Sequence, residues 1–435
     1  MKYSRLSCFV FILYWCTIQS IVADTLNTEL LQKLRSLPGV VEADTMESLC
    51  YPHKFVLYIQ QPLDATCPQS GSFRQRIILS HVGYDRPTVL VTEGYDATYA
   101  TNSHYQEELS KLLNANLVFV EHRYFGESVP DSCNWDYLTV ENAMNDLHRI
   151  RTLFGTFYSR KWLATGISKG GQTAMFYRAF FPEDVEVTVP YVAPLNYSEE
   201  DERHKHFLSD KISSAVNRKK VETAQLELLK RKPSLFPLFK SYCAEKEYTF
   251  RVSMEEIYDF CVLEYAFALW QWGTPLTDIP SLKASDKVWF RHFIEISEPG
   301  YFSKETPYLP FNVQAVRELG YYAYDIRPFR KYLSLKTTKN YMQRVMLPEE
   351  LSYLKFDASL YKRTVKFLKS HDPKMIYIYG GADPWVASGV TWLRGKHNIK
   401  VYVLPDGSHT TRIMSFDVST QKEIKALLLQ WLDSN

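Results

Sequence analysis

Short apolar runs separated by turn residues recur along the first half of the chain and predict β-strands. They cover residues 55–59, 73–79, 87–92, 117–120, 162–165 and 185–191. Between them, apolar residues recur every three or four positions over residues 139–154, and a second helical pattern follows Gly166 to about Phe181. An opening pair of strands, followed by strands that alternate with helices, predicts an α/β domain with a largely parallel sheet.

The pattern changes after residue 197. From residue 198 to 365 the apolar positions have helical spacing, with charge runs between them. Two strands and a final helix are then predicted at residues 375–379, 400–404 and 420–432. A helical insertion in one α/β core explains this order better than two consecutive domains. We therefore expect a core formed by residues 24–197 and 366–435, with a helical cap at 198–365.

The first 23 residues, 1–23, have the features of a secretory signal peptide. Lys2 and Arg5 form a basic start, residues 6–18 are apolar, and Ala23 is a small residue suited to cleavage. The apolar stretch is too short for a stable membrane span, and no later segment is long and apolar enough for one. We therefore expect a secreted or periplasmic protein, with an uncleaved anchor as the alternative.

Composition and charge narrow the class of protein. The chain of 435 residues is 46% hydrophobic, which is enough for a packed core and too much for a disordered chain. It has 51 Lys and Arg against 49 Asp and Glu, and loss of Lys2 and Arg5 with the signal peptide would balance them. Near-neutral charge argues against a nucleic-acid-binding protein, which usually carries a strong basic excess.

Cleavage after Ala23 would leave an odd number of cysteines, namely Cys50, Cys67, Cys133, Cys243 and Cys261. An exported chain permits disulfides, and an odd number leaves one cysteine over. The first strand separates Cys50 from Cys67, whereas Cys67 and Cys133 both follow strands at the same sheet edge. We predict the pairs Cys67–Cys133 and, within the cap, Cys243–Cys261.

The segment Gly166-Ile-Ser-Lys-Gly170 fits the G-x-S-x-G pattern. Its small residues allow a tight strand-to-helix turn that lifts the Ser168 hydroxyl above the sheet edge. The pattern alone is common, and a plain turn serine is the alternative. The strand predicted before it and the helix predicted after it favour a nucleophile.

A serine hydroxyl needs a base, and two candidates follow the last two predicted strands. Asp383 and His409 would emerge at the same sheet edge as Ser168, because parallel strands end on one side. The chain order Ser, Asp, His is that of α/β-hydrolases. His409 would take the serine proton, and Asp383 would orient the imidazole. The alternative is that both lie in ordinary surface loops.

The remaining polar motifs have supporting roles. The negative oxygen of an acyl-transfer reaction needs two amides, which we assign to Lys169 and Tyr95, with Gly94 as the alternative to Tyr95. Arg123, in the segment Glu121-His-Arg-Tyr-Phe-Gly-Glu-Ser, is expected to brace the loops beneath the site. Its neighbours His122 and Glu121 lack a third ligand, so we expect no metal there. The serine chemistry itself needs no metal or cofactor, and we expect none.

Several segments together resemble the secreted tripeptidyl/prolyl aminopeptidase family of streptomycetes, serine peptidases related to prolyl carboxypeptidase and dipeptidyl peptidase II. The matching segments are Glu93-Gly-Tyr, Glu121 to Ser128, Tyr137-Leu-Thr, Gly166 to Gly171, Tyr191-Val-Ala-Pro and Ala382-Asp-Pro-Trp. The resemblance covers most of the chain from about residue 50. It implies an α/β-hydrolase fold with an inserted helical cap, and a triad at Ser168, Asp383 and His409. It also implies a serine exopeptidase that removes short peptides, such as tri- or tetrapeptides, from free N-termini, often with proline near the cut.

Such an enzyme must recognise an α-ammonium group, which calls for a partly buried carboxylate. Glu264 is the one acid in an almost wholly apolar helical pattern at 260–272, and a buried lone carboxylate is costly unless it is paired. We therefore predict Glu264 as the amine anchor, with an ion pair between cap helices as the alternative. Glu93, Asp96 and Glu127 are the other candidates.

Aromatic residues suggest how proline is recognised. Trp385 directly follows Asp383-Pro384, where its indole could stack on a proline ring, and Trp270 and Trp272 could do so from the cap. Packing in the core is the alternative for each. Two other functions compete with this one: an esterase or lipase with the same triad, and an inactive binding protein on the same fold. Peptides with a free N-terminus are the expected partners, and the sequence does not indicate an oligomeric state.

Overall fold

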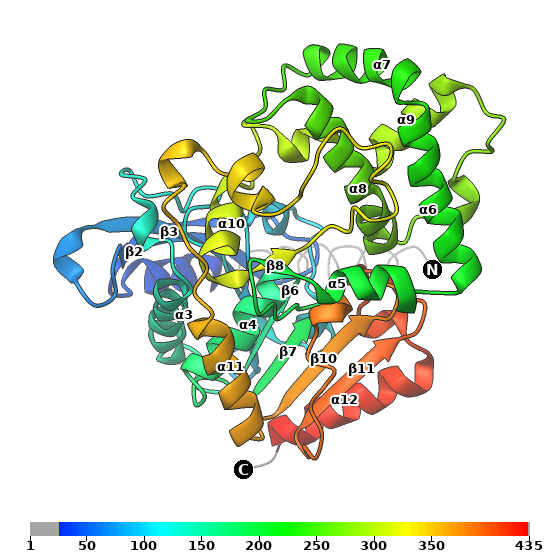
Figure 1. Cartoon of the computed structure of the whole chain (residues 1–435). Helices are drawn as coiled ribbons and strands as arrows, with labels where there is room; N and C mark the ends of the chain where they lie inside the picture. The colour runs from blue at the N-terminus through cyan, green and yellow to red at the C-terminus, as the bar shows by residue number, and fades with distance from the viewer. Residues whose placement is uncertain (1–25, 434–435) are drawn as a thin grey trace, which may run out of the picture.

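A nine-stranded sheet lies at the centre of the protein, in the order β1-β2-β3-β5-β4-β6-β7-β10-β11 (Figure 1). The computed structural model describes residues 26–433, so the predicted signal peptide at 1–23 lies outside the described residues. The strands are β1 (Val40–Met46), β2 (His53–Pro62), β3 (Ser72–His81), β4 (Thr88–Thr92), β5 (Asn116–Val120), β6 (Trp162–Ile167), β7 (Val187–Tyr191), β10 (Met375–Gly380) and β11 (Ile399–Leu404).

Most of the sheet is parallel. The strands β5, β4, β6, β7, β10 and β11 pair in parallel, whereas β1, β2 and β3 pair antiparallel at one side. The predicted opening hairpin and parallel sheet are therefore confirmed. Strand β1 was not predicted, because only Ala43 of its seven residues is buried and an edge strand of this kind lacks an apolar run.

Helices cover both faces of the sheet. On β4, Leu90 packs into one apolar cluster while Val89 and Val91 pack into another, as alternation along a strand requires. The first cluster includes α3 (Val140–Gly155), α4 (Lys169–Phe180) and α11 (Ser359–Ser370). The second includes α2 (Glu108–Leu113) and α12 (Val418–Asp433). The result is a three-layer α/β/α core, which agrees with the predicted fold class.

The segment between β7 and β10 is mainly helical. It contains α5 (Arg203–His206), α6 (Ala215–Lys230), α7 (Lys232–Glu245), α8 (Met254–Trp272), α9 (Asp286–Ile296) and α10 (Leu309–Gln314), with the short pair β8 (Glu200–Asp201) and β9 (Tyr321–Tyr322). Figure 1 shows α6 to α9 gathered beyond one end of the sheet. Helix α11 crosses the predicted boundary at residue 365 but packs against α4 of the core.

Candidate active site

Ser168 occupies a strained turn between β6 and α4. Its φ is 57° and its ψ is −120°, a conformation that serine rarely adopts. The main-chain amide of Ser168 donates a hydrogen bond of 2.9 Å to the carbonyl of Tyr191 on β7. The turn therefore holds Ser168 where β6 gives way to the helix, as the G-x-S-x-G pattern predicts.

The glycines of this turn are required by close backbone approach. A Cβ atom on Gly166 would lie 2.3 Å from the carbonyl oxygen of Gly170, and one on Gly171 would lie 2.6 Å from that of Tyr191. Real Cβ atoms do not approach backbone so closely. The strand-to-helix turn can thus be this tight only because these positions lack side chains.

Asp383 and His409 form a buried pair at the ends of β10 and β11. The Nδ1 atom of His409 is 2.7 Å from Oδ2 of Asp383, and the two side chains are 5% and 0% exposed. An ionised carboxylate only accepts hydrogen bonds, so it holds the histidine proton on Nδ1 and leaves Nε2 as a base. The other carboxylate oxygen, Oδ1, accepts a hydrogen bond of 3.1 Å from the amide of Trp385.

A cavity of about 920 Å³ opens onto Ser168 and His409. Its lining includes seven of the nine residues that the sequence assigned to the site: Tyr95, Ser168, Lys169, Glu264, Trp272, Trp385 and His409. Asp383 lies behind His409, outside the lining. The structure therefore brings together residues from both the core and the helical segment.

Trp270 is the exception. It lines a separate cavity of about 130 Å³, whereas Trp272 lines the cavity at Ser168. Residues two positions apart on a helix point to nearly opposite sides, so Trp270 and Trp272 of α8 do not face the same space. The expectation that Trp270 contributes to the substrate cavity is wrong for this geometrical reason.

The loop after β4 packs directly against the turn at Ser168, called here the nucleophile turn after the role predicted for this serine. A Cβ atom on Gly94 would be 2.7 Å from the amide nitrogen of Gly170. The side chain of Lys169 donates a hydrogen bond from Nζ to the Gly94 carbonyl, and the amide of Tyr95 donates one of 3.2 Å to Oε1 of Glu93. The two amides predicted to bind the negative oxygen therefore belong to adjoining segments.

Glu264 is a buried carboxylate that faces the cavity from α8. It is 9% exposed and accepts hydrogen bonds of 2.7 Å from the hydroxyls of Tyr322 and Tyr324. Burial raises its pKa to about 7, although the two hydroxyls act in the opposite direction. Within residues 26–433 no ion pair includes Glu264. The alternative of an ion pair between cap helices is therefore wrong.

The other candidate acids differ in their surroundings. Glu93 lines the cavity and accepts a hydrogen bond of 2.7 Å from the hydroxyl of Tyr99, and burial raises its pKa. Asp96 also lines the cavity. Glu127 does not, because it pairs with Arg76 on the neighbouring strand and its side chain is 51% exposed.

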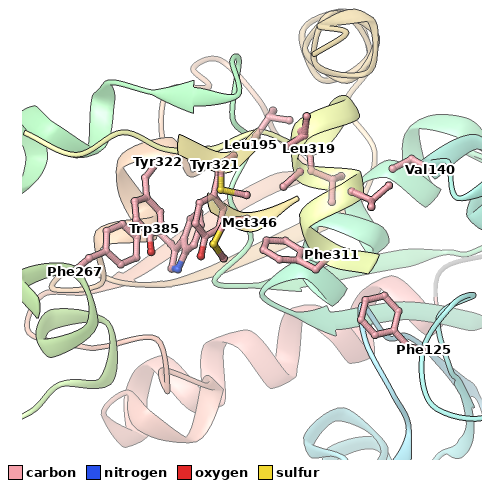
Figure 2. Close-up of a cluster of buried hydrophobic side chains, with 14 of the residues drawn as sticks. Phe125, Val140, Leu195, Phe267, Phe311, Leu319, Tyr321, Tyr322, Met346 and Trp385 are labelled. Atoms are coloured by element: carbon pink, nitrogen blue, oxygen red, sulfur yellow. The ribbon is translucent and has the colours of Figure 1, made fainter. Parts of the chain in front are cut away.

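Trp385 and Trp272 meet the cavity in different ways. Figure 2 shows Trp385 among Tyr321, Tyr322 and Phe267, and these rings lie 5.1 to 5.3 Å from it in edge-to-face geometry. Trp385 is only 6% exposed. Trp272 is 59% exposed, and its ring lies edge-on to the imidazole of His409 at 5.9 Å.

Some residues at the site were not predicted. The carbonyl of Gln271 accepts a hydrogen bond from the His409 amide, and the guanidinium of Arg412 donates one of 3.1 Å to the His409 carbonyl. The first contact joins two backbone groups and the second ends on one, and backbone groups leave no pattern in a sequence. Tyr322 and Tyr324, the partners of Glu264, do leave one, since alternate residues of an extended segment share a side.

Arg123 has the bracing role predicted for it. Its Nε and Nη2 atoms donate to the two carboxylate oxygens of Asp146 at 2.7 and 2.8 Å, and Nη1 donates to the carbonyls of Leu63 and Tyr137. One buried guanidinium thereby joins α3 to two loops beneath the site.

The predicted disulfides are absent, because all five described cysteines are free. Cys67 follows β2 and Cys133 follows β5, which run in the same direction on either side of β3, but each thiol contacts its own loop, at Gln69 and Pro130. A shared sheet edge did not bring the two sulfur atoms together. Cys243 and Cys261 are buried free thiols on α7 and α8, so the predicted Cys243–Cys261 pair is also wrong.

A mostly parallel sheet with helices on both faces defines the α/β-hydrolase fold, and the strained serine turn and the Asp–His pair lie at strand ends, where that fold can carry a serine hydrolase site. A sequence profile described as PS-10 peptidase S37 matches residues 23–434, and the chain belongs to this family of peptidases. It is therefore a serine peptidase, and the predicted class of enzyme is confirmed.

Two relatives found by sequence are also named as peptidases. The chain is 28% identical to a prolyl tri/tetrapeptidyl aminopeptidase of Streptomyces mobaraensis, over 93% of this chain and 85% of the relative. It is 30% identical to the human lysosomal Pro-X carboxypeptidase over 32% of each chain. Among solved structures, a proline iminopeptidase of Mycobacterium smegmatis is 13% identical, with a TM-score of 0.36 over 86% of this chain and 97% of the other.

Helices able to cross a membrane do not occur within residues 26–433.

Proposed function

We propose that the protein is an exopeptidase that removes tri- or tetrapeptides from free N-termini, often with proline near the cut. Family membership supports a serine peptidase, and the name of the Streptomyces mobaraensis relative supports the substrate class. The observation that carries the proposal is Glu264, a buried carboxylate without an ion-pair partner among residues 26–433, in the cavity that contains Ser168 and His409.

The chemistry follows from the arrangement of the three candidate catalytic groups. Ser168 Oγ attacks the scissile carbonyl carbon while His409 Nε2 takes its proton, and the carbonyl electron pair moves to oxygen. The amides of Lys169 and Tyr95 bind this negative oxygen. His409 then protonates the leaving amine, and water hydrolyses the acyl-enzyme by the same steps in reverse. Asp383 keeps the imidazole oriented and stabilises its cation.

Glu264 supplies the recognition of the substrate's N-terminus. A carboxylate in a largely apolar cavity binds an ammonium strongly, because few water molecules compete for it. The hydroxyls of Tyr322 and Tyr324 hold the carboxylate in place. A fatty acyl chain would gain nothing from this group, which disfavours the esterase or lipase alternative.

The two tryptophans of the cavity have different roles in the proposal. Trp272 offers an exposed indole beside His409, on which a proline ring can stack. Trp385 is packed on several sides by other rings and forms part of the cavity wall.

The proposal also includes export and a division into core and cap. Residues 1–23 would direct secretion and be removed, which agrees with the pattern of their sequence. The segment at 198–365 would act as the cap that admits chain ends to the cavity and refuses folded chains.

The test is a comparison of substrates. The purified protein is incubated with peptide amides that have a free N-terminus, with their N-acetylated counterparts and with a fatty ester, beside the Ser168→Ala variant. We expect release of tri- or tetrapeptides from the free-amine series alone, and no turnover by Ser168→Ala. Equal hydrolysis of free and acetylated peptides would refute the exopeptidase, and preference for the ester would favour the alternative.

A further inference from the structure

Lys169 places a buried ammonium group beside the nucleophile. It follows Ser168 as the first residue of α4, and it is 3% exposed. No ion pair among residues 26–433 includes it, although a buried cation without a paired anion is costly. Burial lowers the pKa of this ammonium to about 7, while Glu93 and Glu318 act in the opposite direction. Because burial of the Lys169 ammonium without an ion pair is unfavourable, we expect its position to serve a function.

The contacts of the ammonium all lie in the loops that face the nucleophile turn. Nζ donates a hydrogen bond to the Gly94 carbonyl. It also lies 5.5 Å from the ring centroid of Tyr95 and 5.0 Å from that of Phe125, where aromatic rings attract a cation. The side chain thus ties the start of α4 to the loop after β4.

The Gly94 carbonyl and the Tyr95 amide belong to one peptide unit. Residues 26–433 contain no cis peptide bond, so the C=O and N–H of this unit point in opposite directions. Because the Lys169 ammonium binds the Gly94 carbonyl, the Tyr95 N–H points away from Lys169. There the amide meets Oε1 of Glu93 at 3.2 Å, and Glu93 lines the cavity that contains Ser168.

Packing restricts the same peptide from a third side. A Cβ atom on Gly94 would lie 2.7 Å from both the amide nitrogen of Gly170 and the Cβ of Lys169. The unit is held at its carbonyl by Lys169, at its Cα by the nucleophile turn and at its amide by Glu93.

We propose that Lys169 is a positioning residue for the oxyanion hole: its ammonium holds the Gly94–Tyr95 peptide so that the Tyr95 amide faces the substrate oxygen. The inference rests on the acyl-enzyme reaction proposed above. As Ser168 Oγ bonds to the scissile carbon, the carbonyl electron pair moves to oxygen and the serine proton moves to His409. The Tyr95 amide then transfers its hydrogen bond from Glu93 to that oxygen, while Glu93 keeps the Tyr99 hydroxyl.

Replacement of the ammonium tests this role. Loss of one oxyanion donor costs about 10²- to 10³-fold in kcat, so misplacing one by Lys169→Met should lower kcat by about 10- to 100-fold. KM should change by less than about threefold, because the donor acts in the transition state. The matched control is Lys161→Met, at a lysine that is 43% exposed and pairs with Glu186, where kcat should not change.

A purely structural role is distinguished by inhibitor binding. A peptide aldehyde forms a tetrahedral adduct with Ser168, so its affinity should fall by the same factor as kcat/KM in Lys169→Met. Substrate affinity measured in the Ser168→Ala background should be unaffected by the same change. Unchanged aldehyde affinity, or a lower melting temperature with kcat per active site unchanged, would overturn the inference.

Two further measurements cover other outcomes. Where Lys169→Met does not fold, Lys169→Arg keeps a cation and should retain more kcat than Lys169→Gln; the reverse order would contradict the inference.

Labelling of Ser168 by a fluorophosphonate needs no peptide recognition. If wild type labels but does not cleave free-amine peptides, the proposed function fails, while about tenfold slower labelling of Lys169→Met still supports the role of Lys169.

Discussion

The main-chain amide of His409 donates a hydrogen bond of 2.9 Å to the carbonyl of Gln271, at the end of α8. The proposed catalytic base is therefore held from one side by Asp383 and from the other by the helical segment. The next residues of α8 extend this contact, since Trp272 lies against the imidazole and a Cβ atom on Gly273 would be 2.9 Å from Ser408.

Gly273→Ala should disturb the position of His409. Gly273 has a φ of +67° and closes α8, so alanine there adds backbone strain of about 1 kcal/mol and pushes against Ser408. We expect kcat to fall by about tenfold. The matched control is Gly395→Ala, which has a φ of +69° but no atom within 4 Å of the new Cβ. Gly395→Ala should lower the melting temperature to a similar extent, because the backbone strain is similar, and should leave kcat unchanged. Equal kcat in both variants would contradict the link between Gly273 and the position of His409.

Asp383→Asn should abolish most of the activity without unfolding the protein. An amide cannot hold the Nδ1 proton of His409 as a carboxylate does, and this exchange in serine peptidases costs about 10⁴-fold in kcat. Steady-state kinetics with a free-amine peptide measure the loss. Asp372→Asn, at an aspartate that caps the backbone of the loop before β11, provides the control and should keep wild-type kcat. A fall of less than tenfold for Asp383→Asn would remove Asp383 from the proposed triad.

Glu264→Gln should weaken binding of free-amine substrates by about 10- to 100-fold, the effect expected for a charge-assisted contact. Because the pKa of Glu264 is about 7, the carboxylate that binds an ammonium forms as pH rises through 7. KM of the wild type for free-amine peptides should therefore fall between about pH 6 and 8. This change should be absent in Glu264→Gln and with N-acetylated substrates.

Ionisation of Glu264 as pH rises should strengthen substrate binding but lower the stability of the fold. The folded pKa of Glu264 is raised above the unfolded value, so its contribution to stability is complete below about pH 4.5 and is lost as pH rises through 7. The wild type should lose stability relative to Glu264→Gln over this range. Glu107→Gln is the control, since burial also raises the pKa of Glu107 to about 7 but that residue does not line the cavity. The wild type should also lose stability relative to Glu107→Gln as pH rises, whereas KM should be the same in Glu107→Gln and the wild type.

The two cavity tryptophans should separate stability from specificity. Trp385→Ala removes a buried ring from an aromatic cluster and should cost about 3–5 kcal/mol in the free energy of unfolding. Trp272→Ala should leave the melting temperature nearly unchanged, because its ring is 59% exposed, but lower the kcat/KM ratio of proline to alanine substrates. Denaturant unfolding and paired substrates measure the two effects. An unchanged ratio in Trp272→Ala would refute stacking on proline.

The cysteines should behave as free thiols of two kinds. Cys67 and Cys133 are exposed and should react with a thiol reagent in the folded protein. Cys243 and Cys261 are buried, and burial raises the pKa of Cys243 to about 12, so both should react only after unfolding. Mass spectrometry of labelled peptides checks this order. A peptide that links two of these positions would show that a disulfide forms.

Local patterns of residues were enough to predict the elements and the candidate chemistry of the core. Alternating apolar runs identified the parallel strands, and the order of Ser168, Asp383 and His409 followed from one turn motif and two strand ends. Each of these features is visible in a few consecutive residues. A strand buried on both faces is a run of apolar residues, and a tight turn requires residues with small or no side chains. The edge strand β1 was missed because it buries little, and its residues carry no such pattern.

Which side chains of the helical segment share the cavity depends on how its helices pack in three dimensions. Glu264 faces two tyrosine hydroxyls rather than a cation, Trp272 faces His409, and Trp270 faces elsewhere on the same helix. Neither the predicted disulfides nor the contact of Gln271 with His409 could be settled by spacing. These contacts join residues far apart in the chain. They depend on where backbone atoms lie and on which side of a helix faces the cavity, and a pattern of amino acids specifies neither.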